Sequence, residues 1–149
     1  MAAIQADSTR NVAALLGGKK TLKRAITERG DMRDALREGL PFGALEAFAH
    51  ALGCTKGSLM GVIGIAPRTL ARRKGQRILN AAESDRLYRH ARVTQMAVHT
   101  LRSLEKAKHW LDRPNRALSG ETPLSLLDTD IGARQVETIL GWIDHGIFS

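Results

Sequence analysis

Apolar residues at helical spacing, interrupted by glycine and proline, restrict most strongly how this chain folds. Within residues 42–52, one face of a helix is formed by Leu45, Phe48, Ala49 and Leu52, which recur at i, i+3, i+4 and i+7. A glycine follows directly, at the position where a left-handed residue commonly ends a helix. A succession of short helices that pack through such faces predicts an all-α fold.

The composition favours helices and a reducing compartment. Hydrophobic residues make up 43% of the 149 residues, enough for a core, and aromatic residues only 4%, fewer than strand-rich folds usually contain. Cys54 is the single cysteine, so no intrachain disulfide can form. We find no signal-peptide pattern and no apolar run of membrane-spanning length. We therefore expect a cytoplasmic protein.

Glycine and proline divide the first part of the chain into short segments. Residues 1–20 show no clear period and are expected to form a mobile arm or a loose first helix. Patchy helical spacing follows over residues 21–40. Two further short helices are expected over residues 55–63 and 67–74, the second ending at Gly75.

The rest of the chain is expected to hold one long helix and two shorter ones. Asn80-Ala81-Ala82-Glu83 has the form of a capping box and opens a helix that must end near Pro114. The other predicted elements are a loop over 115–120, a short helix over 122–127 and a last helix over about 132–145, capped by Asp128 or Asp130.

Positive charge is confined to the first part of the chain. Residues 1–90 contain 16 Lys and Arg against 8 Asp and Glu, a net charge of +8, whereas residues 91–149 contain 7 of each and are neutral. The first part therefore suits a polyanion such as DNA and the second does not. A merely soluble basic surface is the alternative interpretation.

Residues 55–74 have the layout of a helix-turn-helix, in which two short helices meet at a tight turn and the second enters the DNA major groove. Gly64 permits the backbone angles of that turn. Three residues depart from the usual pattern: Met60 stands where a small residue is common, Gly61 weakens the first helix, and Arg73 stands at an apolar position.

The second of these helices carries the candidate DNA-binding residues. Arg68, Thr69 and Arg72 lie near its start and are best placed to contact base edges. Arg73, Lys74 and Arg77 are expected to contact phosphate and to make binding salt-dependent. The alternative is a solvated basic face on an ordinary helix. Because one module reads few base pairs, we expect a dimer on a two-fold operator.

The sequence contains no recognisable catalytic or metal-binding motif. No histidine pairs with Cys54 or with another histidine at zinc-finger spacing, so we expect no metal and no cofactor. Nucleophile elbows, phosphate-binding loops and dinucleotide-binding fingerprints are absent as well. We therefore expect a protein that is not an enzyme.

Short motifs in the second half of the chain resemble the toxin-binding domain of Xre/MbcA/ParS-type antitoxins, and two upstream motifs look like the Xre half of the same family. The C-terminal elements are Trp110-Leu111, Pro114-Asn115, Ala117-Leu118, Thr122-Pro123-Leu124, Leu127-Asp128, Gly132, Val136, Leu140 and His145-Gly146. The upstream elements are Arg68 to Arg73 and Glu83 to Leu87. The resemblance covers residues 40–149 and leaves residues 1–39 unexplained.

The resemblance implies an antitoxin of a RES–Xre toxin–antitoxin pair. Residues 40–90 would form an Xre-like helix-turn-helix domain that represses the shared operon, and residues 91–149 a small helical toxin-binding domain. Residues 1–39 would be an N-terminal arm or helices of uncertain role. The partner would be a RES-domain toxin that consumes NAD, and the C-terminal region would block its active site. Dimers and larger antitoxin–toxin assemblies are implied, as is a location in the bacterial cytoplasm, with the nucleoid when the protein is bound to its operator.

Candidate toxin contacts follow from this resemblance and from the apolar chain end. Apolar residues at a terminus can anchor in a partner's groove, or they can fold back onto Trp142 and complete the protein's own core. The candidates are Arg116, Arg134, Glu137, Trp142, His145, Ile147, Phe148 and Ser149.

Two other functions remain open from the sequence. One is a homodimeric helix-turn-helix transcription regulator without a toxin partner, whose C-terminal half serves only dimerisation. The other is an adaptor that binds proteins alone.

Overall fold

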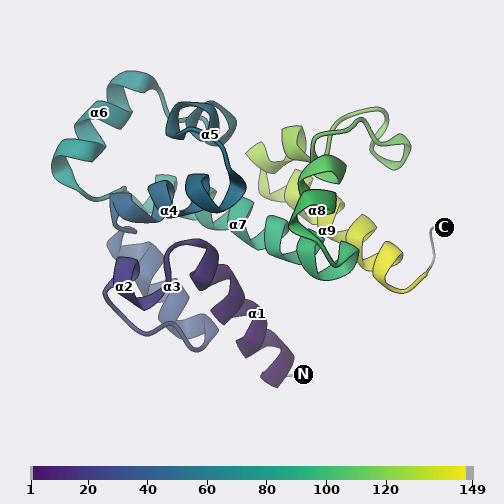
Figure 1. Ribbon diagram of the computed structural model, residues 1–149, viewed down its shortest axis with the longest axis horizontal. Coiled ribbons are helices and arrows are strands. Elements are labelled where there is room, and N and C mark those ends of the chain that lie inside the picture. Colours follow the sequence, from purple (N-terminus) through teal and green to yellow (C-terminus); the bar gives the residue numbers. More distant parts are fainter. Residues whose placement is uncertain (1, 147–149) are drawn as a thin grey trace. The chain divides into compact units, whose positions relative to one another are not determined.

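The computed structural model is helical and divides into two compact units (Figure 1). It describes the backbone of residues 2–146 and the side chains of residues 8–146, and within these residues it holds no β-strand. The first unit covers residues 1–91 and the second residues 92–149, with the boundary inside helix α7 (Ala81–Leu101). The expected all-α class is confirmed.

The first unit consists of short helices and the first half of α7. These helices are α1 (Ala2–Leu15), α2 (Gly18–Leu22), α3 (Arg29–Glu38), α4 (Phe42–Leu52), α5 (Lys56–Ile63) and α6 (Pro67–Gln76). The spacing of apolar residues predicts α4 with the observed bounds, and Gly53 ends it at φ 68°. Thr55 caps α5 by accepting a hydrogen bond from the backbone N–H of Ser58 at 3.1 Å.

The core of the first unit includes the N-terminal helix. Leu40, Leu45 and Phe48 are buried together with Val12, in the last turn of α1, and Leu16, which directly follows the helix. Of the two predictions for residues 1–20, the mobile arm is wrong; a first helix is present, and its end packs in the core instead of being loose. Its lack of period concealed a short apolar face that packs on a core formed mainly by later helices.

Residues 21–40, where we expect patchy helical spacing broken by Gly30, are divided between the end of α2 and the whole of α3, which passes through Gly30. The chain turns at Lys23, whose φ is 58°. A capping box formed by Glu28 and Asp31 then starts α3. The Asp31 carboxylate accepts hydrogen bonds from the Thr27 backbone and hydroxyl and from the Glu28 backbone, and these bonds hold the pKa of Asp31 below its usual value.

Helix α6 is longer than its sequence indicates. It passes through Gly75, where the chain was expected to leave the helix, and ends at Arg77, whose φ is 63°. The backbone N–H of Arg77 donates to the carbonyl of Arg73 at 2.7 Å. A glycine in a helix is unfavourable by only about 1 kcal/mol, so tertiary contacts can override it.

A short antiparallel contact fastens the end of α6 to the start of α4. The N–H of Phe42 donates to the carbonyl of Arg77 at 3.0 Å, and the N–H of Leu79 donates to the carbonyl of Leu40 at 2.9 Å. The buried N–H of Leu40 donates to the hydroxyl of Ser84 in α7 at 2.7 Å. The segment that precedes α4 and the segment that follows α6 are thereby held together.

The second unit continues from α7 through two α-helices and two short 3-10 helices. These elements are α8 (Leu104–Leu111), η1 (Arg116–Leu118), η2 (Leu124–Asp128) and α9 (Asp130–Asp144). The prediction of one helix from residue 80 to Pro114 is wrong, because the chain breaks at Arg102, whose φ is 65°. Ser103 then caps α8 by accepting from the N–H of Lys106 at 3.2 Å.

The cap of α9 also differs from the prediction. Thr129 accepts a hydrogen bond from the N–H of Gly132 at 3.0 Å, in place of the expected Asp128 or Asp130. Asp130 instead accepts from Arg134 one turn later, at 2.8 Å. Both aspartates flank the true cap, so the predicted cap is one residue away from it, and the helix begins at Asp130, two residues before the predicted start at residue 132.

Helix α9 packs closely on η2 at its first turn. A Cβ added at Gly132 would lie 2.0 Å from the backbone oxygen of Leu126, so glycine is the only residue that fits without movement. Further along the helix, Val136, Ile139 and Leu140 are buried in the core of this unit. The close approach at Gly132 thus sets the position of the whole apolar face.

We expect Gly132→Ala to destabilise the second unit by about 2 kcal/mol, because the added methyl group forces α9 and η2 apart. Gly141→Ala on the same helix is the matched control. A Cβ there meets no atom within 4 Å, so this change should stabilise the helix by about 0.5–1 kcal/mol. Urea unfolding followed by tryptophan fluorescence measures both, since Trp110 and Trp142 both belong to this unit. Equal stability of the two variants would contradict the packing argument.

Candidate DNA and toxin interfaces

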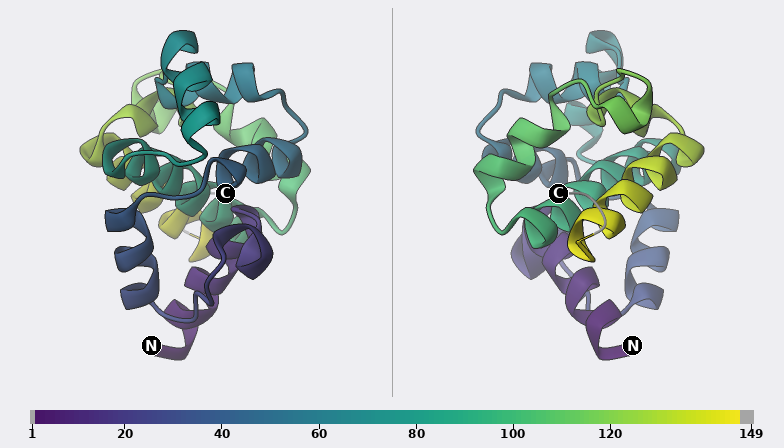
Figure 2. Two further views of the ribbon diagram at one scale, coloured as in Figure 1. Left: turned by 90° about the vertical axis from the view of Figure 1, so that its left-hand side faces the viewer. Right: turned by 90° about the vertical axis from the view of Figure 1, so that its right-hand side faces the viewer.

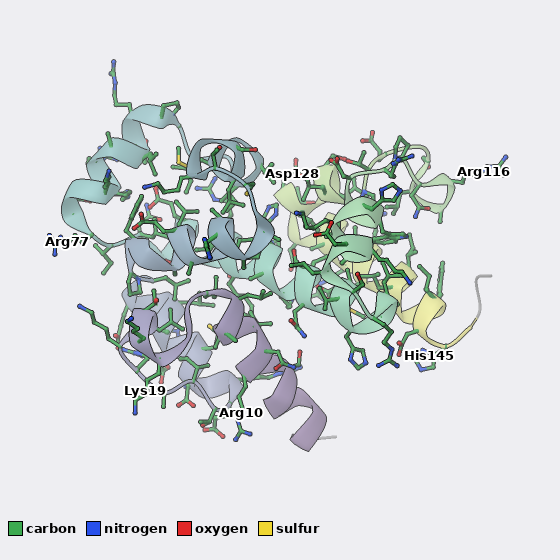
Figure 3. The ribbon with its side chains drawn as sticks, viewed as in Figure 1. Arg10, Lys19, Arg77, Arg116, Asp128 and His145 are labelled. Carbon is green, nitrogen blue, oxygen red and sulfur yellow. The ribbon has the colours of Figure 1, made fainter. Side chains whose placement is uncertain are left out.

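Helix α6 presents a basic and largely exposed surface at the margin of the first unit (Figure 1). None of its residues is fully buried, although Leu70 packs partly against the core. Most predicted DNA contacts lie on this surface. Thr69 is half-buried, and the exposed members are Arg68, Arg72, Lys74 and Arg77. Figure 3 shows Arg77 pointing outward from the end of the helix.

Arg73 is the exception among the predicted DNA contacts. Its Nε donates to Oε1 of Glu83 at 2.7 Å, and the two side chains are 15% and 4% exposed. Its Nη1 also donates to Gln76 at 2.8 Å. A buried carboxylate needs such a partner, so the guanidinium is used within the protein. We therefore assign Arg73 a structural role in place of the expected phosphate contact.

The same carboxylate completes the capping box that the sequence predicts. Glu83 accepts from the N–H of Asn80 at 2.9 Å, and the side chain of Asn80 accepts from the N–H of Glu83 at 2.7 Å. One buried group therefore starts α7 and anchors α6. The ion pair with Glu83 explains why Arg73 stands at a position that is usually apolar in a helix-turn-helix.

The turn between α5 and α6 has the geometry expected of a helix-turn-helix. Gly64 ends α5 at φ 82°. Arg86 of α7 donates to the carbonyls of Ile63 and Gly64 at 3.5 and 3.2 Å, which satisfies acceptors at the end of α5. Met60 is 3% exposed and forms part of the core, so its flexible side chain takes the place of the usual small residue.

In the second unit, α9 carries apolar side chains on its outer face. Ile131 is 74% exposed and Trp142 is 41% exposed. They lie eleven residues apart, about three helical turns, and Gln135 and Thr138 between them are also exposed. His145 continues the same face and its Nδ1 lies 2.7 Å from the carbonyl oxygen of Gly141. We call this surface the α9 outer face.

Two of the predicted toxin contacts lie on the α9 outer face, Trp142 and His145, and two others pair within the unit. Nε of Arg134 donates to Asp130 at 2.8 Å, which raises the pKa of Arg134 above the usual arginine value. Glu137 accepts from Nε of Arg92 on α7 at 2.9 Å. The carboxylate of Glu137 therefore joins α7 to α9 within the unit, and its contact with a toxin stays a prediction.

The remaining candidates are Arg116 and the last three residues of the chain. Arg116 is exposed on η1 and points outward (Figure 3). Ile147, Phe148 and Ser149 lie outside the described residues.

Ile131 is the residue that the sequence analysis missed. Its position on a helix is about 140° from Val136, the centre of the buried face, so a helical projection would have placed it outside. A large aliphatic residue that is so exposed contributes little to the core of its own unit.

Two family models match the chain, one in each unit. The Antitoxin Xre-like helix-turn-helix domain matches residues 31–92. The Antitoxin Xre/MbcA/ParS C-terminal toxin-binding domain matches residues 96–146.

Three relatives described as Antitoxin Xre are similar to the chain. That of Photorhabdus laumondii subsp. laumondii is 38% identical over 116 residues, which cover 76% of this chain and 78% of the relative. That of Yersinia enterocolitica is 30% identical over 120 residues, 78% of this chain and 80% of the relative. That of Pseudomonas putida is 44% identical over 68 residues, 46% of this chain and 43% of the relative.

The chain belongs to the Xre antitoxin family. As an antitoxin with a helix-turn-helix domain and a toxin-binding domain, it has DNA and a toxin as its implied partners. The helix-turn-helix match begins inside α3, so α1 and α2 lie outside it although they pack in the same core.

The described part of the antitoxin contains neither a membrane-spanning helix nor a metal-binding cluster. Among residues 2–146, no helix has the length and apolarity that a membrane crossing requires. No three histidine, cysteine or carboxylate side chains gather as a metal site among the side chains that the structure describes.

Adjacent arginines in α6 should respond differently to alanine substitution. We expect Arg73→Ala to lower the stability of the antitoxin by about 3 kcal/mol, because it leaves the Glu83 carboxylate buried without its cation. Arg72→Ala removes an exposed side chain and should change stability by less than about 0.5 kcal/mol while weakening DNA binding. Thermal unfolding by circular dichroism and fluorescence anisotropy with operator DNA measure the two effects. Two variants with the same melting temperature would refute the structural role of Arg73.

Proposed function

We propose that this antitoxin neutralises a RES-domain toxin that consumes NAD, by laying the α9 outer face and the chain end against it so that substrate cannot reach the active site. We further propose that it represses its own operon through α6. The observation that carries the first proposal is the exposure of Ile131 and Trp142 on one helix of the unit that matches a toxin-binding domain.

Apolar burial supplies the affinity in this proposal. Transfer of an exposed isoleucine side chain from water to a protein interface yields about 1.5–3 kcal/mol. Tryptophan is among the residues that most often dominate binding energy at interfaces. Two such anchors three turns apart suit a groove that receives one face of a helix. The polar residues between them, Gln135 and Thr138, allow the same face to remain soluble before the toxin binds.

Charged residues at the margin of this face would orient the toxin. Arg134 and Asp130 form an exposed pair on the first turns of α9, with side chains 76% and 55% exposed. Arg116 extends from η1. Rim charges of this kind affect association rate and orientation more than final affinity.

Operator recognition rests on the residues near the start of α6. Arg68 and Arg72 are exposed and carry the guanidinium groups that pair with guanine in the major groove, and Thr69 lies beside them. Lys74 and Arg77 are placed for phosphate. A single helix reads only a few base pairs, so a dimer on a two-fold operator supplies the specificity.

Toxin binding should depend on Ile131 and tolerate the same change elsewhere. We expect Ile131→Glu to weaken binding of the co-expressed toxin at least about tenfold, because a carboxylate would enter an apolar contact. Val62→Glu is the matched control, since Val62 is also an exposed aliphatic residue, 39% exposed, but belongs to the helix-turn-helix unit. Calorimetric titration and growth in cells that express the toxin measure the outcome. Equal toxin affinity in the two variants would argue against the α9 outer face.

The chain end calls for a precise truncation. Removing residues 133–149 would delete Val136 and Leu140, which are buried, and would unfold the second unit. A chain that ends at Gly146 removes only Ile147, Phe148 and Ser149. Loss of neutralisation by this short form, with unchanged tryptophan fluorescence, would support a role of the chain end in covering the toxin site.

Autoregulation is tested with a reporter fused to the antitoxin's own promoter. We expect Arg68→Ala to relieve repression and to leave toxin binding unchanged, because the residue lies outside the unit that matches a toxin-binding domain. A homodimeric regulator without a toxin partner would show the same repression but would capture no product of the neighbouring gene. Full repression by the Arg68→Ala variant would contradict base reading by α6.

A further inference from the structure

Three lysines in and directly after the short helix α2 form a basic surface that the family match leaves unexplained. Between Asp7 and Glu28 the chain carries five basic residues and no acidic one. Arg24 is paired with Glu38. The three lysines are exposed and form no ion pair with a described residue: they are Lys19, Lys20 and Lys23. We call this surface the α2 lysine patch.

The patch is borne by a fixed part of the fold. Leu22 is 5% exposed and packs in the core of the first unit. The side chain of Thr21 fits against Gly43 of α4, where an added Cβ would lie 3.1 Å from its Cγ2. The N–H of Lys23 donates to the carbonyl of Lys19 at 2.8 Å and closes the turn. The lysines therefore extend from a packed helix, and ordering the backbone adds little to the entropic cost of binding a ligand.

Contacts within the unit link α2 to the end of α6 through the start of α4. Thr21 touches Gly43, and the preceding residue, Phe42, donates its N–H to the carbonyl of Arg77. Lys23 lines a small pocket with Pro41, which forms a β-bridge with the residue after Arg77. Both α2 and α6 lie on the face of this unit that is turned to the viewer in the left panel of Figure 2. Figure 3 shows Lys19 and Arg77 pointing outward.

We propose that the α2 lysine patch binds the phosphate backbone of DNA beside the bases that α6 contacts. The proposal rests on the proposed operator binding and adds a second contact surface outside the matched helix-turn-helix. Lysine ammonium groups act as point charges toward phosphate and carry no sequence preference. The one apolar side chain of α2, Leu22, is buried, so the patch lacks the exposed anchor that a protein interface or a membrane surface uses.

Continuity of charge favours DNA as the ligand. The exposed basic residues of α6 end at Arg77, and the α2 lysine patch begins across the bridge that joins Pro41 to Ile78. Duplex DNA carries one phosphate per about 1.7 Å of its axis, so a protein edge that continues past the recognition helix meets further phosphates. Each lysine that neutralises one releases a counterion and adds to the salt dependence of binding.

The test removes the three charges and measures salt dependence. The variant carries Lys19→Gln, Lys20→Gln and Lys23→Gln, and the matched control carries Lys106→Gln, Lys108→Gln and Arg113→Gln in the toxin-binding unit, with the same change of net charge. Binding of the full-length antitoxin to operator and to random duplex is measured between roughly 50 and 200 mM salt, the range in which counterion release is strong. Thermal unfolding checks that both variants fold like the wild type.

We expect the α2 variant to bind both duplexes about tenfold more weakly at 200 mM salt and roughly 400-fold more weakly at 50 mM, with the ratio of operator to random affinity unchanged. The slope of log K against log salt should fall by about 0.9 for each phosphate that is no longer neutralised, or roughly 2.7 in total. Hydroxyl-radical footprinting should show weaker protection beside the bases read by α6. A slope equal to that of the control, or a weakening confined to operator DNA, would overturn the proposal.

The two proposals can fail separately. If the wild type binds DNA without preferring its operator but the α2 variant still lowers the slope, operator recognition is wrong and the backbone contact stands. If the Arg68→Ala variant loses preference for the operator while the α2 variant behaves like its control, operator recognition stands and the backbone contact is wrong.

Discussion

The ion pair between Arg73 and Glu83 is the interaction on which the exposed helix α6 depends. A helix without a fully buried residue has little hydrophobic attachment to its own unit, and here Leu70 supplies only part of one. The guanidinium therefore serves as the anchor, and the carboxylate that receives it also caps α7 through the N–H of Asn80. Removing water from such a pair is costly. The short hydrogen bond from Nε of Arg73 to Oε1 of Glu83, at 2.7 Å, offsets much of that cost.

This form of attachment explains how the first unit can expose so much positive charge. Because α6 is held by one ion pair and by the backbone contact between Phe42 and Arg77, its remaining basic side chains are not needed to hold the helix in place. The same contact joins the end of α6 to the start of α4, against which Thr21 of α2 packs. A surface that binds a polyanion can then extend across several helices without any of those side chains being needed for the core.

In the second unit, contacts fix the position of α9 and leave the α9 outer face exposed. Gly132 allows α9 to touch η2, and Glu137 joins it to Arg92 on α7. These two contacts and the buried face set the rotation of the helix about its axis. Ile131 and Trp142 are exposed as a consequence of that rotation. An apolar pair held outward by a rigid scaffold is suited to a partner surface, since little ordering is left to be done on binding.

Local chemistry is enough to predict the helical class, the separation of charge between the two units, the turn at Gly64 and the capping box at Asn80. Each of these follows from an apolar period, from the residue type at a cap, or from the net charge of a segment. The break at Arg102 has a local signal as well, the cap that Ser103 provides, which the apolar period alone does not reveal. Local chemistry could not reveal that Arg73 is used internally or that Glu137 pairs with Arg92, because each pair joins side chains of two different helices. Those points were settled by the folded arrangement, since the free energy of a buried charge is set by the partners that other elements bring to it.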